Sequence, residues 1–253
     1  MKKTKGLLFA LLALLLLLSA CGANNSSSGG QGGQSAASGG DGKTYKWNFL
    51  AFVALEHPMA KLEIEFADAV RERTNGRLDI TVSPPGELPY KADEYLRVTG
   101  DGSVEMTDSF ISFISGDMRV ASISNLPFLI SNFDELQKAM EVMAPYIEEE
   151  FKSYGVKQLW YYPWPPQQLW GSGNPINHTD GLKNVSIRAQ SPEQATFLNS
   201  IGAVPVSLNT NEVPTAAQRG TVKGVITASL NILGSKWYEF TDWGYFIGLS
   251  VPP

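Results

Sequence analysis

The chain has 253 residues, of which 43% are hydrophobic and 18% are charged, so it can bury the core of one large domain or two small ones. Its 25 acidic and 20 basic residues give a formal net charge of -5. That balance argues against nucleic acid as a partner, because no basic surface is available to neutralise phosphates.

Residues 1–20 are typical of a secretory signal peptide. Three lysines precede an apolar run at residues 7–18, which is too short for a standard membrane span. The run closes with Leu-Ser-Ala-Cys, which resembles the lipobox of bacterial lipoproteins. We predict that Cys21 is acylated and that the protein is extracytoplasmic, lipid-anchored to the cell membrane at the cell surface or in the periplasm. An ordinary signal peptide that ends in cysteine is the alternative, and it would leave the protein unanchored.

The segment after Cys21 is rich in Gly, Ser, Asn and Gln and nearly lacks apolar side chains, so it buries too little surface to fold. Residues 21–44 therefore read as a flexible tether. Cys21 is the only cysteine and the chain has two histidines, which excludes an internal disulfide and a Cys/His zinc site. We predict neither a metal nor a cofactor.

The folded part opens with a β-α-β-α-β pattern, which predicts a parallel sheet with helical crossovers. The predicted strands lie at residues 45–52, 78–82 and 104–106, and the helices at residues 58–75 and 90–98.

A longer helix is expected after Asn132, which forms a capping pair with Glu135. Pro145 is expected to kink or split that helix, since proline removes a helical hydrogen bond. Residues 156–162 then read as a further strand.

The run Pro-Trp-Pro-Pro at residues 163–166 is stiff and lacks three backbone donors. We predict that it is the crossing between two lobes. Lobe I then covers residues 45–165 and lobe II covers residues 166–253.

Arg188 lies in an unusual place. Residues 185–188 read as a strand, and Ser191, Pro192 and Gln194 carry the signature of a helix start. Arg188 is therefore expected at the C-terminal end of a strand, the edge at which open α/β sheets bind ligands. Its guanidinium fits a carboxylate or a phosphate. An ordinary ion pair with a neighbouring Asp or Glu is the alternative.

The chain continues with strands at residues 203–208 and 222–226 and helices at residues 212–219 and 236–240. There is no P-loop, no dinucleotide-binding glycine motif and no nucleophile elbow. A pair of glycosidase carboxylates stays open, because the fold sets their separation.

Five aromatic residues fall within eleven positions, which suggests either core packing or a ligand wall. They are Trp160, Tyr161, Tyr162, Trp164 and Trp170. In an extracellular protein, stacking on carbohydrate is a further alternative.

Several segments resemble, in order, the substrate-binding proteins of tripartite ATP-independent periplasmic (TRAP) transporters, the DctP type. The segments are SNLPFLISNFDELQKAM, GLKNVSIRAQSPEQATFLNSIGAVPVSL, NEVPTAAQRGTVKGV and ILGSKWYEF. The likeness covers about residues 45–251. It implies a type II-like periplasmic-binding-protein fold, α/β, in which two lobes close on a ligand. Each lobe is a mixed, mainly parallel sheet flanked by helices.

The resemblance also implies a receptor, not an enzyme, that passes a small organic acid to the TRAP membrane subunits. Arg188 matches the arginine that pairs with the ligand carboxylate in this family. The other expected pocket residues are Gln168, Thr210, Asn211 and Thr227, with Trp164 or Trp170 facing the body of the ligand.

Two departures from the family pattern narrow these expectations. A second basic residue near Gln168 is missing, which disfavours sialic acid and favours a monocarboxylate with an apolar or aromatic body. Relatives continue beyond the position of Pro253. We therefore expect that C-terminal segments are missing, either because the sequence is a fragment or because the chain ends here. If the chain ends at Pro253, residues 246–251 should expose apolar surface.

Two functions of other classes stay open at this point. One is a secreted lipoprotein enzyme acting on small acids or sugars, although no nucleophile or acid–base pair stands out. The other is an adhesive or structural lipoprotein that uses its aromatic residues as a partner surface.

Overall fold

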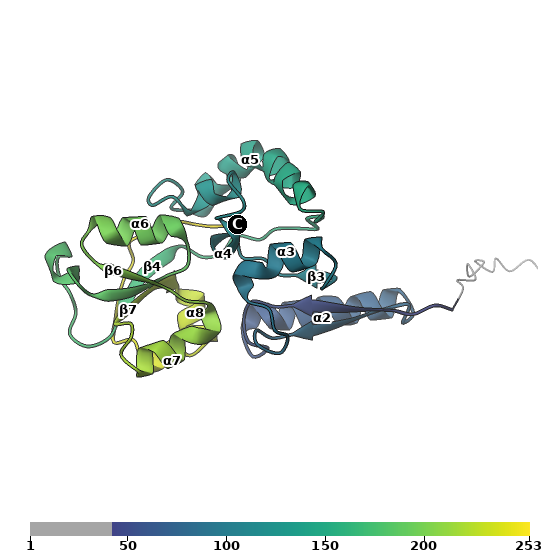
Figure 1. The fold of residues 1–253 in the computed structure, drawn as a ribbon, viewed down its shortest axis with the longest axis horizontal. Helices are drawn as coiled ribbons and strands as arrows, with labels where there is room; N and C mark the ends of the chain where they lie inside the picture. The colour runs from purple at the N-terminus through teal and green to yellow at the C-terminus, as the bar shows by residue number, and fades with distance from the viewer. Residues whose placement is uncertain (1–41) are drawn as a thin grey trace, which may run out of the picture. The chain divides into compact units, whose positions relative to one another are not determined.

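The structure, a computed structural model, describes residues 42–253 (Figure 1). The signal peptide, Cys21 and nearly all of the tether lie outside the described residues, so these predictions are not tested by it. Within residues 42–253, no helix is both long and apolar enough to cross a bilayer. Two sheets organise this part of the chain. We call each sheet with its helices a lobe.

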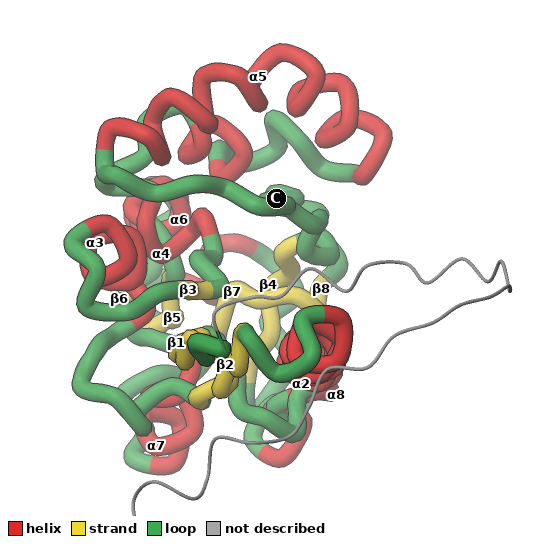
Figure 2. The backbone as a smooth tube through the Cα atoms, turned by 90° about the vertical axis from the view of Figure 1, so that its right-hand side faces the viewer, coloured by secondary structure: helices red, strands yellow, loops and turns green. Residues whose placement is uncertain are grey.

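The first lobe holds a three-stranded sheet whose strand pairs are all parallel, in the order β2-β1-β3. This confirms the predicted β-α-β-α-β order. Figure 2 shows its strands lying between α3 and α2. The elements are β1 (Tyr45–Leu50), α2 (Pro58–Arg73), β2 (Leu78–Ser83), η1 (Ala92–Glu94), α3 (Tyr95–Gly100) and β3 (Met106–Thr107).

Side-chain alternation along β1 explains how this sheet is covered on both faces. Phe49 packs with Ala67 of α2 on one face. Leu50 packs with Tyr95 and Val98 of α3 on the other. The sheet is therefore buried on both sides, as parallel sheets generally are.

Three helical segments follow: α4 (Ile111–Ile114), η2 (Ala121–Asn125) and α5 (Phe133–Ser153). The Asn132 side chain accepts a hydrogen bond from the backbone N–H of Glu135 at 3.0 Å, which confirms the predicted cap. The helix is not split at Pro145. Buried apolar residues on both sides of the proline hold the two parts of α5 against one core.

Residues 156–162 do not form a strand, so that prediction was wrong. The sheet of the first lobe ends at β3, which pairs only with β1 among the described residues. A strand needs a hydrogen-bonded neighbour, and sequence alternation alone does not supply one.

The second lobe holds a five-stranded mixed sheet in the order β6-β5-β7-β4-β8. The β5 strand is parallel to β6 and β7, while β4 is antiparallel to β7 and β8. The strands are β4 (Gln167–Gly171), β5 (Ser186–Ala189), β6 (Val204–Ser207), β7 (Gly224–Ala228) and β8 (Trp243–Tyr245). Neither β4 nor β8 is predicted from the sequence.

The helical segments of this lobe are η3 (Thr179–Leu182), α6 (Pro192–Ser200), η4 (Thr210–Glu212), α7 (Val213–Gln218), α8 (Ser229–Gly234) and η5 (Trp237–Glu239). The start of α6 agrees with its sequence signature, because the Ser191 hydroxyl accepts a hydrogen bond from Gln194 N–H at 3.3 Å. Gly202 follows the helix end with φ of +81°, a conformation that favours glycine.

The last residues cross from one lobe to the other. Leu249 belongs to the core between the second sheet and α6, and Val251 belongs to the core around α5. Both are fully buried, so the expectation of exposed apolar surface at residues 246–251 was wrong for these two residues. It is confirmed for Phe246, which is 75% exposed. The two side chains are buried by packing in these cores, and backbone hydrogen bonds from Leu249 to Gln167 and from Val251 to Ile130 hold the segment in place.

Candidate functional site

Three of the expected pocket residues lie on one face of the second sheet. Gln168 of β4 is the register partner of Thr227 of β7, so their side chains share a face. Arg188 of β5 is opposite Val225, which lies two residues before Thr227 and therefore on that same face. The opposite face, with Ile187, packs against α6.

Arg188 is fully buried and only partly satisfied. Its Nε donates to the carbonyl of Leu208 at 3.0 Å, and its Nη1 donates to the carbonyl of Ile226 at 3.2 Å. Its Nη2 is buried as well and has no hydrogen-bond partner in the described part of the chain. A buried donor without a partner is costly, so this nitrogen is suited to an acceptor brought by a ligand.

The ordinary ion pair considered for Arg188 is absent from residues 42–253, because no carboxylate lies within 4.0 Å of the guanidinium. Burial lowers the pKa of Arg188 to about 9, and the negative charge of Glu212 opposes this shift. The group stays charged at neutral pH. A buried cation with no paired anion is unfavourable, and a bound anion relieves that cost.

Two aromatic rings enclose the guanidinium, and the sequence analysis missed both as site residues. The Arg188 Cζ lies 5.6 Å from the ring centroid of Phe113 and 5.7 Å from that of Trp237. Phe113 belongs to α4 of the first lobe and Trp237 to η5 of the second. Rings at this distance attract a cation through their faces. The site therefore takes groups from both lobes.

The polar residues expected in the pocket differ in the hydrogen bonds that their side chains make. Thr210 is buried and lies two residues after Leu208, whose carbonyl accepts from Arg188, and its hydroxyl has no partner within residues 42–253. The Thr227 hydroxyl accepts from Asn231 Nδ2 at 2.9 Å. Gln168 Oε1 accepts from the backbone N–H of Gly248 at 2.9 Å. Of these three side chains, Thr210 is the one that makes no hydrogen bond within residues 42–253.

Asn211 is exposed, and its side chain lies close to the first lobe. A methyl group added at Gly86 would lie 3.8 Å from its Nδ2. Nearby, Asn209 Nδ2 donates to Asp93 Oδ1 at 3.4 Å. This edge of the second lobe therefore faces the first lobe.

The two tryptophans proposed as ligand walls make extensive packing contacts. Trp164 is 1% exposed, and its ring centroid lies 5.6 Å from that of Phe110 and 5.9 Å from that of His57. Trp170 Nε1 donates to the carbonyl of Thr227 at 3.0 Å, and its ring lies 5.5 Å from Phe246. These contacts show a packing role for both residues, and their contact with a ligand stays a prediction.

No group of three or more His, Cys, Asp or Glu side chains in residues 42–253 is arranged to bind a metal ion.

Comparison with known proteins identifies the family of this chain. The sequence model of the family described as bacterial extracellular solute-binding protein, family 7 (DctP) matches residues 50–246. The C4-dicarboxylate-binding periplasmic protein DctP of Rhodobacter capsulatus is 25% identical over 194 residues, which are 76% of this chain and 58% of that protein. The C4-dicarboxylate-binding protein DctB of Bacillus subtilis is 23% identical over 199 residues, 78% of this chain and 57% of that protein. The chain thus spans less than two thirds of the length of these relatives.

Solved structures show the same fold. DctP7 of Bordetella pertussis, an extracytoplasmic solute receptor binding pyroglutamic acid, has a TM-score of 0.78 and 25% identity, covering 83% of this chain and 69% of that one. A TRAP periplasmic solute-binding protein of Sulfurospirillum deleyianum with bound succinate has a TM-score of 0.73 and 21% identity, covering 82% and 67%. With the family match, these findings establish that the chain belongs to the DctP family, family 7 of the bacterial extracellular solute-binding proteins.

Proposed function

We propose that this protein is a receptor that captures a small organic acid outside the cytoplasm and delivers it to the membrane subunits of a TRAP transporter. The observation that carries the proposal is the buried guanidinium of Arg188, which has a free Nη2 and no carboxylate partner within residues 42–253. A ligand carboxylate that accepts from Nη2 satisfies both the charge and the donor.

The ligand that fits best is a monocarboxylate with a compact, partly apolar body. Arg188 supplies one cationic group, and Gln168, Thr210 and Thr227 around it are uncharged. A second carboxylate would therefore be buried without a cation, which is costly. Phe113 and Trp237 favour an apolar or ring-shaped body beside the charge. The pyroglutamate bound by DctP7 is a ligand of this kind.

Binding is coupled to movement of the lobes in this proposal. The described contacts between lobes include Phe113 with Arg188 and Asn209 with Asp93. A ligand shifts the population toward the closed form only if it binds that form more tightly. A carboxylate held by Arg188 contacts Phe113 of the other lobe only when the lobes are closed. The closed form therefore binds the ligand more tightly than the open form.

The remaining parts of the proposal concern the context of the receptor. Acylation at Cys21 and a tether over residues 21–44 would hold the protein at the membrane. The lobe boundaries that we propose are residues 45–165 and 166–253. We propose binding without turnover, and no nucleic acid as a partner.

Isothermal titration of the full chain with pyroglutamate, succinate and sialic acid tests the proposal. We expect the tightest binding for pyroglutamate or another ring-shaped monocarboxylate, and none for Arg188→Ala. Arg219→Ala, which changes an exposed arginine of the same lobe, is the matched control and should bind normally. Retained affinity in Arg188→Ala would reduce that arginine to a structural role. Tight binding of succinate or sialic acid alone would overturn the monocarboxylate assignment.

A further inference from the structure

His57 lies where the first lobe meets α8 of the second lobe. The residue caps the start of α2 and is fully buried, with its ring stacked on that of Trp164 at 5.9 Å between centroids. On the side of α8, the ring packs so closely against Gly234 that a methyl group added there would overlap the imidazole. Figures 1 and 2 show α8 beside the start of α2. The ring is therefore enclosed by groups of both lobes.

The hydrogen bonds of His57 define which of its nitrogens carries the proton. Nδ1 accepts from the backbone N–H of Met59 at 3.2 Å, and this bond caps α2. A nitrogen that accepts carries no proton, so the proton of the neutral ring lies on Nε2. Nε2 is buried and has no hydrogen-bond partner within residues 42–253. The first lobe thus presents one buried, unpaired donor to α8.

Asn231 of α8 carries a matching acceptor. The residue is 1% exposed, and its Oδ1 has no partner within residues 42–253. Burial lowers the pKa of His57, whereas the carbonyl of Leu230 and the side chain of Asn231 oppose this shift and are therefore close to the ring. A buried donor and a buried acceptor that are close and unpaired gain free energy when they meet.

Asn231 also connects His57 to the carboxylate site. Its Nδ2 donates to the hydroxyl oxygen of Thr227 at 2.9 Å. Thr227 is an expected ligand contact and lies on the same sheet face as Arg188. Because its oxygen already accepts from Asn231, the proton of the Thr227 hydroxyl is available for a carboxylate. A shift of Asn231 toward His57 moves the donor that orients this hydroxyl.

We propose that His57 is a positioning residue for ligand binding, which holds Asn231, and through it the Thr227 hydroxyl, when the lobes are closed. The inference rests on the proposed function of the Arg188 site. His57 acts from the first lobe, whereas Asn231 and Thr227 belong to the second. The contact therefore forms only in the closed protein and favours the closed form.

Only the neutral imidazole can take this role. A protonated ring carries a hydrogen on Nδ1, which breaks the hydrogen bond from Met59 N–H. It also places a buried cation at the N-terminus of α2, where the helix dipole is positive. Acid therefore favours an open form in which water reaches the ring, and the affinity for the ligand falls.

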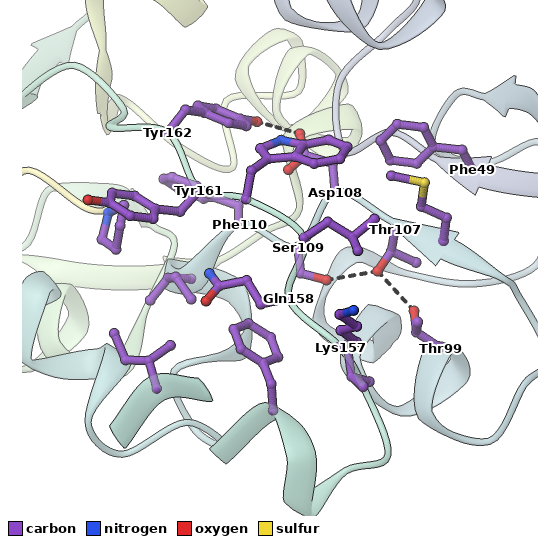
Figure 3. Close-up of a pocket in the computed structure, with 18 of the residues that line it drawn as sticks. Phe49, Thr99, Thr107, Asp108, Ser109, Phe110, Lys157, Gln158, Tyr161 and Tyr162 are labelled. Atoms are coloured by element: carbon purple, nitrogen blue, oxygen red, sulfur yellow. Dashed lines mark hydrogen bonds between the residues drawn. The ribbon is translucent and has the colours of Figure 1, made fainter. Parts of the chain in front are cut away.

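The other titratable groups around the ring belong to neighbouring segments, because α8 and residues 163–166 carry none. They are Glu56, Lys61, Glu63, Asp108, Tyr162 and Lys236. Glu56, Lys61 and Lys236 are exposed. The Tyr162 hydroxyl donates to Asp108 at 2.5 Å (Figure 3), and Asp108 is the neighbour of Glu63. All six groups remain in a His57 variant, so a pH response that the variant loses is due to the imidazole.

Isothermal titration of the full chain with pyroglutamate between pH 5 and pH 8 tests the inference. The affinity of the parent should be constant above about pH 6.5, the ordinary pKa of histidine. Below that pH it should fall, by at most about tenfold per pH unit for one coupled proton. The ligand carboxylate titrates near about pH 3.5 and does not contribute in this range.

Two substitutions of His57 separate the roles of its nitrogens. Glutamine places a donor near the position of Nε2 and does not titrate, so His57→Gln should bind at neutral pH and lose the pH response. Asparagine caps a helix but is too short to reach α8, so His57→Asn should bind about 3- to 10-fold more weakly at neutral pH. His178→Gln changes the other histidine, which is exposed, and should behave like the parent. Melting curves show whether each variant is folded.

The pKa of His57, followed by NMR with and without pyroglutamate, is the second readout. By linkage, the ligand should lower this pKa by the free energy by which acid lowers ligand affinity. A flat pH profile in the parent, an equal profile in His57→Gln, or a pKa that the ligand leaves unchanged would overturn the positioning role and leave the receptor intact. A parent that binds no carboxylate at any pH would overturn the receptor proposal and this inference together.

Discussion

The guanidinium carbon of Arg188 lies 5.6 Å from the centroid of the Phe113 ring, and the two residues belong to different lobes. The ring covers the cation from the first lobe, while Trp237 does so from the second at 5.7 Å. A ligand bound to Arg188 is therefore enclosed by the first lobe at the position of Phe113.

Phe113→Ala should weaken carboxylate binding while leaving the fold intact. The ring is only half-buried, and its loss removes a cation contact of about 0.5–2 kcal/mol together with apolar cover. Isothermal titration with pyroglutamate measures the loss. Phe133→Ala removes an exposed ring at the start of α5 and is the control. Equal affinities for both variants and the parent would mean that Phe113 does not cover the ligand.

Thr210→Val should reduce ligand affinity without lowering stability. The Thr210 hydroxyl is buried and has no partner within residues 42–253, so valine removes an unsatisfied group from the ligand-free protein. If the hydroxyl binds the carboxylate, its loss costs about 0.5–1.5 kcal/mol of affinity. Thermal unfolding with and without pyroglutamate separates the two effects, and Thr215→Val on exposed surface serves for comparison. An unchanged ligand-induced shift in Tm would remove Thr210 from the site.

Glu63→Gln should make the protein more stable, and increasingly so as the pH rises. The folded state raises the pKa of Glu63 from 4.5 to about 10, so the folded protein holds a proton that the unfolded chain releases. The stability that this proton contributes is complete below pH 4.5 and is lost as the pH rises toward 10, by at most about 1.4 kcal/mol per pH unit. Glutamine does not titrate and avoids this loss.

Urea unfolding at pH 5, 7 and 9 in phosphate or borate buffer measures the effect. The difference in unfolding free energy between Glu63→Gln and the parent should grow with pH, whereas Glu65→Gln, which changes an exposed glutamate on the same helix, should follow the parent. A difference that does not vary with pH would mean that Glu63 is ionised in the folded protein.

Local signals in the sequence predicted the position of Arg188 well. Ser191, Pro192 and Gln194 identify the start of α6, and the residues before a helix start in an α/β fold end a strand. Local signals of this kind do not predict which side chains contact the guanidinium. Phe113 lies 75 positions before Arg188, and folding alone brings the two together. Of the two rings, only Trp237 could have been suspected from the sequence, since it lies in the KWYE segment that resembles the family.

The strand predictions failed where burial and pairing depend on distant segments. Residues 167–171 (QQLWG) open with two glutamines and show no alternation, yet both glutamines are buried in β4 between β7 and β8. Residues 156–162 show the opposite case, since their pattern suits a strand but they pair with no strand among residues 42–253. The side-chain pattern of a segment indicates which of its faces is buried. Whether the segment pairs as a strand depends on which other segments lie beside it in the fold.

Within residues 42–253, two segments join the lobes, and they are tied to each other by backbone hydrogen bonds. Trp164 N–H donates to the carbonyl of Pro252 at 2.9 Å, and Gln167 N–H donates to that of Ser250 at 2.8 Å. A single linker would let the lobes rotate in every direction, but a bonded pair resists torsion and flexes chiefly about one axis. Much of the rotational entropy of the lobes is thus lost on folding rather than on ligand capture, so less of the binding free energy is spent on orienting them.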